Sequence, residues 1–295
     1  MTKVVQIAIG SIVLGLVVLG LKLVAWQMTG SVALLSDALE STVNVVTAVA
    51  ALVAIRVAAL PADANHPYGH HKAELFSAIL EGVMIIVAAL VILKQVWEGI
   101  QAPHTLDAPL RGLLVNGAAS VINAVWAWVL IHHGRRARSP ALVADGKHLF
   151  LDVVSSVAVA LGVLLAIETG WSWLDPALAG LVAVNILYSG WRVMQQSLSG
   201  LLDESLSDDV LTEVRRVIAT EAIGAVEAHD LRTRTAGAAT FIEFHLVVPG
   251  ALTVSEAHDL CDRVEAALKA LVLDCVVTIH VEPEFKAKHS GIVVL

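Results

Sequence analysis

The sequence predicts an α-helical membrane protein in which six transmembrane helices precede a small α+β domain. Two observations support this fold class. Of the 295 residues, 57% are hydrophobic and 16% are charged, whereas soluble domains carry about 45–50% apolar and about 25% charged residues. Residues 1–202 hold 11 acidic and 11 basic side chains, and residues 203–295 hold 16 acidic and 8 basic ones. We therefore expect a neutral membrane domain over 1–202 and an acidic soluble domain over 203–295.

Six apolar segments are each long enough to cross a bilayer, which takes about 20 helical residues. Turn residues such as Gly30, Pro61 and Pro103 lie between them. The first segment is too long for a signal-peptide core and no Ala-x-Ala site follows it, so we expect a true span. The predicted helices cover Val4–Trp26, Val32–Arg56, Glu74–Trp97, Pro109–His133, Leu142–Ile167 and Leu174–Leu198.

Basic residues predict the orientation of these spans. Lys72 lies in the connector after the second span, and Arg135, Arg136 and Arg138 lie in the connector after the fourth. Lys and Arg concentrate in cytoplasmic loops. Both termini are therefore expected in the cytoplasm.

The acidic tail predicts two amphipathic helices and three strands in the order helix, strand, strand, helix, strand. Ser207 precedes the first helix as a candidate N-cap. This order suits a small open sheet covered on one face by helices. The predicted elements are Asp208–Thr220, Val226–Thr235, Thr240–Val248, Leu252–Leu271 and Cys275–Val281.

The net charge of −8, without a basic run, argues against a polybasic nucleic-acid-binding protein. The high apolar content argues against intrinsic disorder. The two cysteines, Cys261 and Cys275, are too few for a disulfide scaffold.

Polar residues inside the spans are the first candidate site. Glu40 and Asn44 lie four residues apart in the second span, with Asp37 one turn earlier, and His148 and Asp152 repeat this spacing in the fifth. Ionisable groups at mid-bilayer cost several kcal/mol and usually line a path or form a pair. Together Glu40, Asn44, His148 and Asp152 offer three oxygen groups and an imidazole, enough for a tetrahedral divalent cation.

The alternative for the same residues is interhelical hydrogen bonding without a metal, with Glu40 bonded to His148. Glu81 in the third span is treated separately. We expect it to be a carboxyl inside the bundle that bonds a hydroxyl group of a neighbouring helix.

Two further groups carry metal-ligand residue types. Asp63, His66 and His70 lie within eight residues of one connector and leave a fourth position for water or another ligand. The alternative is a solvated polar loop. The tail supplies five more candidates, which singly could be surface residues: His229, His245, His258, His280 and Glu282. Of these, His280 and Glu282 alternate along one predicted strand and so share a face.

Four segments resemble the cation diffusion facilitator family, and bacterial zinc- and iron-type exporters in particular. The resemblance runs nearly end to end. It rests on Ser31-Val-Ala-Leu-Leu-Ser-Asp-Ala, on Pro61-Ala-Asp-Ala-Asn-His-Pro-Tyr-Gly-His-His-Lys-Ala-Glu, on His148-Leu-Phe-Leu-Asp-Val-Val-Ser-Ser and on His229-Asp-Leu-Arg-Thr-Arg.

The resemblance implies a homodimer of six-helix subunits, each with a cytoplasmic domain like a copper metallochaperone. It implies a transport site on Glu40, Asn44, His148 and Asp152, besides the connector site and a two-metal cytoplasmic site on the five tail residues. The sequence departs from the family pattern at two places. Glu282 stands where relatives carry Asp, and Glu40 with Asn44 stands where zinc-type members often carry Asp-Asp or His-Asp.

We therefore expect a proton-coupled antiporter, a secondary active transporter and not an enzyme, that exports divalent cations from the cytoplasm through a bacterial inner membrane. Zinc is the first candidate, with Fe, Co, Mn and Cd as the others. A membrane-anchored metal sensor and a membrane-embedded metalloenzyme without transport remain alternatives. Lys72 and Asp203 are expected to form a charge contact where the membrane part meets the tail, or else to be two solvated charges.

Overall fold

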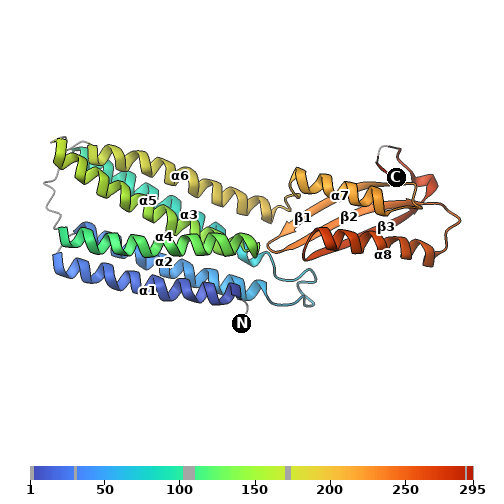
Figure 1. The fold of residues 1–295 in the computed structure, drawn as a ribbon, viewed down its shortest axis with the longest axis horizontal. Helices are drawn as coiled ribbons and strands as arrows, with labels where there is room; N and C mark the ends of the chain where they lie inside the picture. Colours follow the sequence, from blue (N-terminus) through green and yellow to red (C-terminus); the bar gives the residue numbers. More distant parts are fainter. Residues whose placement is uncertain (1–2, 30–31, 102–109, 170–173, 290, 295) are drawn as a thin grey trace. The chain divides into compact units, whose positions relative to one another are not determined.

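The computed structural model describes all residues except 1–2, 30–31, 102–109, 170–173, 290 and 295. The chain divides into two compact units, Met1–Leu198 and Ser199–Leu295. Each unit has its own arrangement of elements and is described by itself below (Figure 1).

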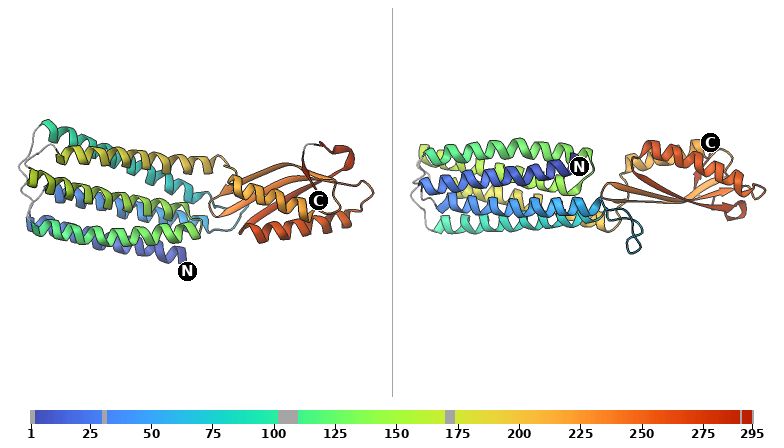
Figure 2. Two further views of the ribbon diagram at one scale, coloured as in Figure 1. Left: turned by 45° about the horizontal axis from the view of Figure 1, so that its top comes forward. Right: turned by 90° about the horizontal axis from the view of Figure 1, so that it is seen from below.

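Six helices of 27 to 30 residues run alongside one another in the first unit (Figure 2). At 1.5 Å per residue each is roughly 40 Å long, which exceeds the hydrocarbon thickness of a bilayer. The six predicted helices are confirmed, with ends that differ from the predicted ones by a few residues. The helices are α1 (Lys3–Thr29), α2 (Val32–Ala58), α3 (Ala73–Gln101), α4 (Leu110–Arg136), α5 (Pro140–Thr169) and α6 (Leu174–Leu201).

Hydropathy singles out three of these helices. Within the described residues, the stretches long and apolar enough to cross a membrane by composition are Lys3–Val24, Ser41–Ala58 and Ala73–Glu98. They lie in α1, α2 and α3.

Small residues let the helices of the bundle approach closely. A Cβ atom added to Gly146 of α5 would lie 2.8 Å from Ile131 of α4, and one added to Gly190 of α6 would lie 2.8 Å from Ile85 of α3. Larger side chains do not fit at such contacts, which are typical of helix packing in membranes. This packing holds α3 and α5, which carry most of the buried polar groups discussed below, at fixed positions in the bundle.

The second unit is an α+β domain with a four-stranded sheet. The strands follow the order β3-β2-β1-β4; β1 pairs antiparallel with both β2 and β4, and β2 pairs parallel with β3. Its elements are α7 (Asp208–Glu221), β1 (Glu227–Ala236), β2 (Ala239–Val248), α8 (Val254–Leu271), β3 (Cys275–Pro283), the 3-10 helix η1 (Glu284–Lys286) and β4 (Ile292–Val293).

The predicted order of two helices and three strands is confirmed, and β4 is an addition. This strand has two residues, which pair with Ala228 and Glu227, and is too short to give a periodic pattern. Ser207 stands at the N-cap of α7 with extended backbone, but its side chain makes no capping hydrogen bond. Ser207 therefore occupies the predicted N-cap position but does not cap the helix with its side chain.

The core of this domain lies between the helices and one face of the sheet. Ile218 of α7 and Val264 of α8 are fully buried with Ile242, Phe244 and Leu246 of β2. Because side chains alternate along a strand, His245 lies on the opposite face of the sheet. The two cysteines, Cys261 and Cys275, are reduced and belong to the core.

Thr253 begins α8 with a capping box, in which its hydroxyl accepts the backbone N–H of Glu256 and the Glu256 carboxylate accepts the backbone N–H of Thr253. Thr253→Ala is expected to lower the free energy of opening of α8 by about 1 kcal/mol, the usual contribution of such a cap. Amide hydrogen exchange over α8 measures this change. Ser255→Ala, at an exposed position of the same helical turn, should leave the exchange rates unaltered.

Candidate metal centres

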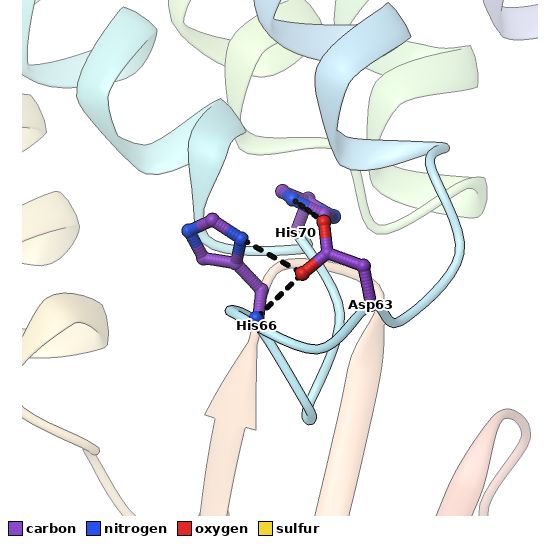
Figure 3. Close-up of side chains that lie close together, drawn as sticks. All are labelled: Asp63, His66 and His70. Carbon is purple, nitrogen blue, oxygen red and sulfur yellow. Dashed lines mark hydrogen bonds and ion pairs between the residues drawn. The ribbon is translucent and has the colours of Figure 1, made fainter.

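The loop between α2 and α3 gathers Asp63, His66 and His70 around one carboxylate (Figure 3). Asp63 Oδ1 lies 3.2 Å from His66 Nδ1, and Asp63 Oδ2 lies 3.4 Å from His70 Nε2. The two imidazole rings are 4.4 Å apart between centroids. The three predicted ligands of this connector site are therefore brought together.

Local hydrogen bonds explain why the loop folds this way. Asp63 Oδ1 accepts the backbone N–H groups of Asn65 and His66, and the His66 contact lowers the pKa of the Asp63 carboxyl. Gly69 has a φ of 81°, a conformation that glycine adopts without strain. This turn directs the chain back so that His70 reaches the second carboxylate oxygen.

A row of three histidines crosses the sheet of the second unit. His245 of β2 is the register partner of both His229 of β1 and His280 of β3. Neighbouring rings lie 5.3 Å (His229 and His245) and 4.8 Å (His245 and His280) apart between centroids. Side chains directly opposite one another share a face of a sheet. We call these three residues the histidine row.

Glu282 of β3 contacts every member of the histidine row. Its carboxylate oxygens lie 3.3 Å from His229 Nε2, 3.5 Å from His245 Nδ1 and 3.7 Å from His280 Nε2. One carboxylate with three imidazoles is a donor set suited to a borderline-soft divalent cation, and two carboxylate oxygens can bridge two ions. Four of the five predicted tail ligands are thus close together.

His258 is the fifth predicted tail ligand, and it lies on α8. In the described part of the chain its ion-pair partner is Asp262, one turn along the same helix, at 3.6 Å. A single copy of the chain therefore does not join His258 to Glu282, and its role in metal binding stays a prediction.

Two acidic residues beside the histidine row were missed by the sequence analysis. Glu227 accepts a hydrogen bond from His229 Nδ1 at 3.1 Å and from the backbone N–H groups of Lys288 and His289, and the Lys288 contact lowers the pKa of the Glu227 carboxyl. Such a bond holds the ring so that the other nitrogen, Nε2, can bind a metal. The sequence feature that could have identified Glu227 is the spacing Glu227-x-His229 on one strand.

Asp230 is the second missed residue, and ligand atoms of Asp230, His229 and His245 lie within 4.8 Å of one another. It stands at a bulge in β1 with a φ of 52°. Lys288 Nζ bonds both of its oxygens, at 2.8 and 2.7 Å, and lowers the pKa of the carboxyl. The bulge was not predictable from the sequence pattern, although Asp230 follows His229 directly.

The helix bundle holds a buried polar network that joins three helices. Asn44 of α2 donates a hydrogen bond to Asp152 of α5 at 2.5 Å, and Asp152 Oδ1 lies 3.8 Å from His148 Nε2 on the same helix. His148 Nδ1 lies 2.6 Å from Glu81 Oε2 of α3. All four residues are at most 8% exposed. We call Asn44, Glu81, His148 and Asp152 the membrane network.

The expectation for Glu81 was wrong in one respect. Glu81 is inside the bundle, as predicted, but its partner is the imidazole of His148 and not a hydroxyl group. A hydroxyl partner is found instead for Glu74, which lies at the start of the same helix. Glu74 accepts a hydrogen bond from Ser139. Helical spacing places Glu74 and Glu81 on one face, but it does not tell which neighbour each one meets.

Three other predicted residues are placed as follows. Glu40 and Asp37 lie in α2, but their side chains fall outside the described residues, so both stay predictions, as does the alternative bond from Glu40 to His148. Asp203 forms an ion pair with Arg234 at 3.3 Å. Its contact with Lys72, which belongs to the other unit, stays a prediction.

The fold defines a membrane protein of several spans with an appended α+β domain, and known families match both parts. The cation efflux transmembrane domain matches residues 8–202, and the cytoplasmic domain of cation efflux proteins matches residues 206–284. The chain therefore belongs to the cation diffusion facilitator, or cation efflux, family. This match confirms the predicted family. As a member of it, the protein is an integral membrane protein and a metal efflux transporter, and it is not an enzyme.

Several individual proteins are similar to this chain. The "Uncharacterized transporter sll1263" of Synechocystis sp. is 44% identical over 262 residues, which are 89% of this chain and 84% of that protein. The cation-efflux pump FieF of Shewanella oneidensis is 33% identical over 264 residues, 89% of this chain and 88% of its own. A solved structure of the Zn form of CzrB is 46% identical and covers 29% of this chain and 98% of its own, with a TM-score of 0.28.

Proposed function

We propose that this protein exports divalent transition-metal cations from the cytoplasm in exchange for protons, with zinc as the main cargo. The observation that supports it is the membrane network, in which Asn44, His148 and Asp152 place an amide, an imidazole and a carboxylate within contact distance inside an apolar bundle. Burying such groups costs several kcal/mol unless they pair or line a path. With Glu40, they complete the proposed four-ligand site.

The donor types favour zinc. Imidazole nitrogen and carboxylate oxygen are common ligands of zinc, which accepts a tetrahedral set. Cobalt, iron, manganese and cadmium remain candidates because a mixed nitrogen and oxygen site binds most divalent transition metals. The cation is the transported substrate, and the residues proposed to hold it are Glu40, Asn44, His148 and Asp152.

Proton exchange follows from the chemistry of these ligands. A metal binds neutral imidazole and ionised carboxylate, so its binding releases protons from the site. When the site faces the far side of the membrane, returning protons compete with the cation for His148 and Asp152 and promote its release. Rocking of helix groups about a fixed site would expose the site to each side in turn.

The proposal includes the orientation and assembly predicted from the sequence. Both termini lie in the cytoplasm of a bacterium, because the basic connectors mark the cytoplasmic side, and the transporter works as a homodimer in the inner membrane. The histidine row and the connector site would then meet cytoplasmic metal. Filling the histidine row would favour one packing of the dimer over another, which is a way to sense the metal supply.

Purified protein in proteoliposomes tests this function. We expect uptake of Zn²⁺ that depends on an imposed pH gradient, with weaker responses to Fe²⁺, Co²⁺, Mn²⁺ and Cd²⁺ offered in parallel. An ionophore that collapses the pH gradient should abolish the uptake. Flux equal to that of protein-free vesicles would support the alternative of a metal sensor without transport, and flux unaffected by the ionophore would contradict proton exchange.

Asn44→Asp is expected to change the pH profile and the metal preference of uptake. Asn44 donates to Asp152 at 2.5 Å, and its Oδ1 atom is buried with no hydrogen-bond partner in the described part of the chain. Two carboxylates at this distance cannot both be ionised in a buried site, so they retain a shared proton. The cation must displace that proton, and half-maximal uptake should therefore move to a higher pH.

The comparison for this variant is Asn123→Asp, which changes another buried asparagine of the bundle outside the membrane network. This control should keep the pH profile of the parent protein. If Asn44→Asp also matches the parent in its pH profile and in its preference among the five metals, Asn44 does not contact the cation.

A further inference from the structure

Glu81 is a buried acid that the proposed transport site does not use. Its side chain is 0% exposed, and it comes from α3, whereas the four proposed ligands come from α2 and α5. Oε2 lies 2.6 Å from His148 Nδ1. Oε1 is buried and has no hydrogen-bond partner among the described residues. A buried carboxylate carries a large desolvation cost, so this arrangement calls for a role.

We propose that Glu81 is the positioning residue of the transport site, and that it fixes the ring orientation and tautomer of His148 for metal binding. A carboxylate oxygen without a proton can only accept a hydrogen bond. In the neutral imidazole that binds a metal, a bond from Nδ1 to Glu81 therefore places the ring proton on Nδ1. The lone pair then resides on Nε2, the nitrogen that faces Asp152 at 3.8 Å. This inference rests on the proposed function.

The geometry around Glu81 supports a rigid role. Gly82, the next residue, packs against α6, where an added Cβ atom would lie 3.0 Å from the backbone nitrogen of Met194. This close contact fixes α3 at the position of Glu81. Carboxylates that orient a metal-binding histidine in this way also raise its basicity, and their loss typically lowers metal affinity 10–100-fold.

Glu81 also brings a third helix into the site. Asn44 connects α2 to α5 through Asp152, and Glu81 connects α3 to α5 through His148. His148 is thus held from its Nδ1 side by one helix while its Nε2 side faces the proposed cargo. An unrestrained ring could turn about its side-chain bonds and would spend part of its time with the wrong nitrogen toward the cation.

Three substitutions of Glu81 distinguish the effect of the position of its carboxylate from the effect of its charge. Glu81→Leu removes the acceptor, and the Zn²⁺ concentration for half-maximal uptake should rise about 10–100-fold with a smaller change in the maximal rate. Glu81→Gln keeps an oxygen that can accept from Nδ1 and should give an intermediate value. Glu81→Asp keeps the charge but withdraws the carboxylate by one methylene group, and should resemble Glu81→Leu.

Glu74 provides the matched control. It is a buried carboxylate of the same helix, bonded to Ser139 and not to the membrane network. Glu74→Leu and Glu74→Gln, measured in the same proteoliposomes, should leave the half-maximal Zn²⁺ concentration within the error of the parent value. Size-exclusion chromatography and thermal unfolding of each purified variant report whether the bundle is folded.

These measurements test the role of Glu81 separately from the proposed transport function. If the parent protein transports Zn²⁺ and folded Glu81→Leu has the same half-maximal concentration, Glu81 does not position His148. A Glu81→Asp variant that behaves as the parent would also overturn the inference, because charge alone would then suffice. If Glu81→Leu does not fold, the comparison of Glu81→Asp with Glu81→Gln gives the decision. A parent protein without flux would refute the proposed function itself.

Discussion

Replacing Asp152 by alanine should abolish metal flux in proteoliposomes while leaving a folded protein. Asp152 accepts the hydrogen bond of Asn44 from α2 and faces His148 Nε2. Its side chain is the one carboxylate among the described side chains of the proposed site. Losing a direct ligand should cost more than the 10–100-fold that indirect changes cost, so we expect flux to fall by more than about 100-fold.

Asp152→Asn tests whether charge or shape is responsible. Asparagine fills nearly the same volume and can still bond Asn44, but it offers the cation no negative charge. We expect flux to be lost in this variant as well. Ser155→Ala, one turn further along α5, removes a hydroxyl that bonds the backbone carbonyl of Asp152 and should retain flux. Normal transport by the two Asp152 variants would take this carboxylate out of the path.

The second large effect is expected in the α+β domain. His245→Ala together with His280→Ala removes two of the three imidazoles that contact Glu282. Calorimetry of the purified full-length protein should then find fewer Zn²⁺ ions bound per chain. Flux should fall only partly, because the proposed transport site lies on α2 and α5 and keeps its ligands.

His289→Asn is the comparison for this double variant. His289 has a φ of 55°, which asparagine tolerates, and its backbone N–H, which bonds Glu227, is retained. It should bind as many Zn²⁺ ions as the parent protein. If the double variant of His245 and His280 also keeps the parent stoichiometry, the histidine row does not hold metal.

The fold was largely predictable because its signals are local. Six long apolar segments and the alternation along β2 and β3 are properties of short stretches of sequence. The same alternation placed His280 and Glu282 on one face, and the sheet confirms their contact at 3.7 Å. The strand β4 could not be predicted, since its two residues depend on pairing with β1.

The side-chain contacts within the sites depend on which helices and strands become neighbours. These contacts could not be predicted from the sequence. The position of Glu81 within the third predicted span indicated a place inside the bundle but could not select His148 over a hydroxyl group as its partner. The orienting bond from His229 to Glu227 depends on side-chain rotation. The loop of Asp63, His66 and His70 was easier, because all three residues lie within eight positions and fold around one another.

Burial of both cysteines has a practical consequence for spectroscopy. Cys261 and Cys275 are 9% and 7% exposed, and burial raises the pKa of the Cys261 thiol, which leaves little of its reactive thiolate at neutral pH. Maleimide or nitroxide reagents should therefore spare the natural chain. A cysteine introduced at an exposed site such as Val254 of α8, which is 88% exposed, would be labelled selectively without first removing the native thiols. Spin-label distances between the copies of the proposed homodimer could then be followed as metal is added.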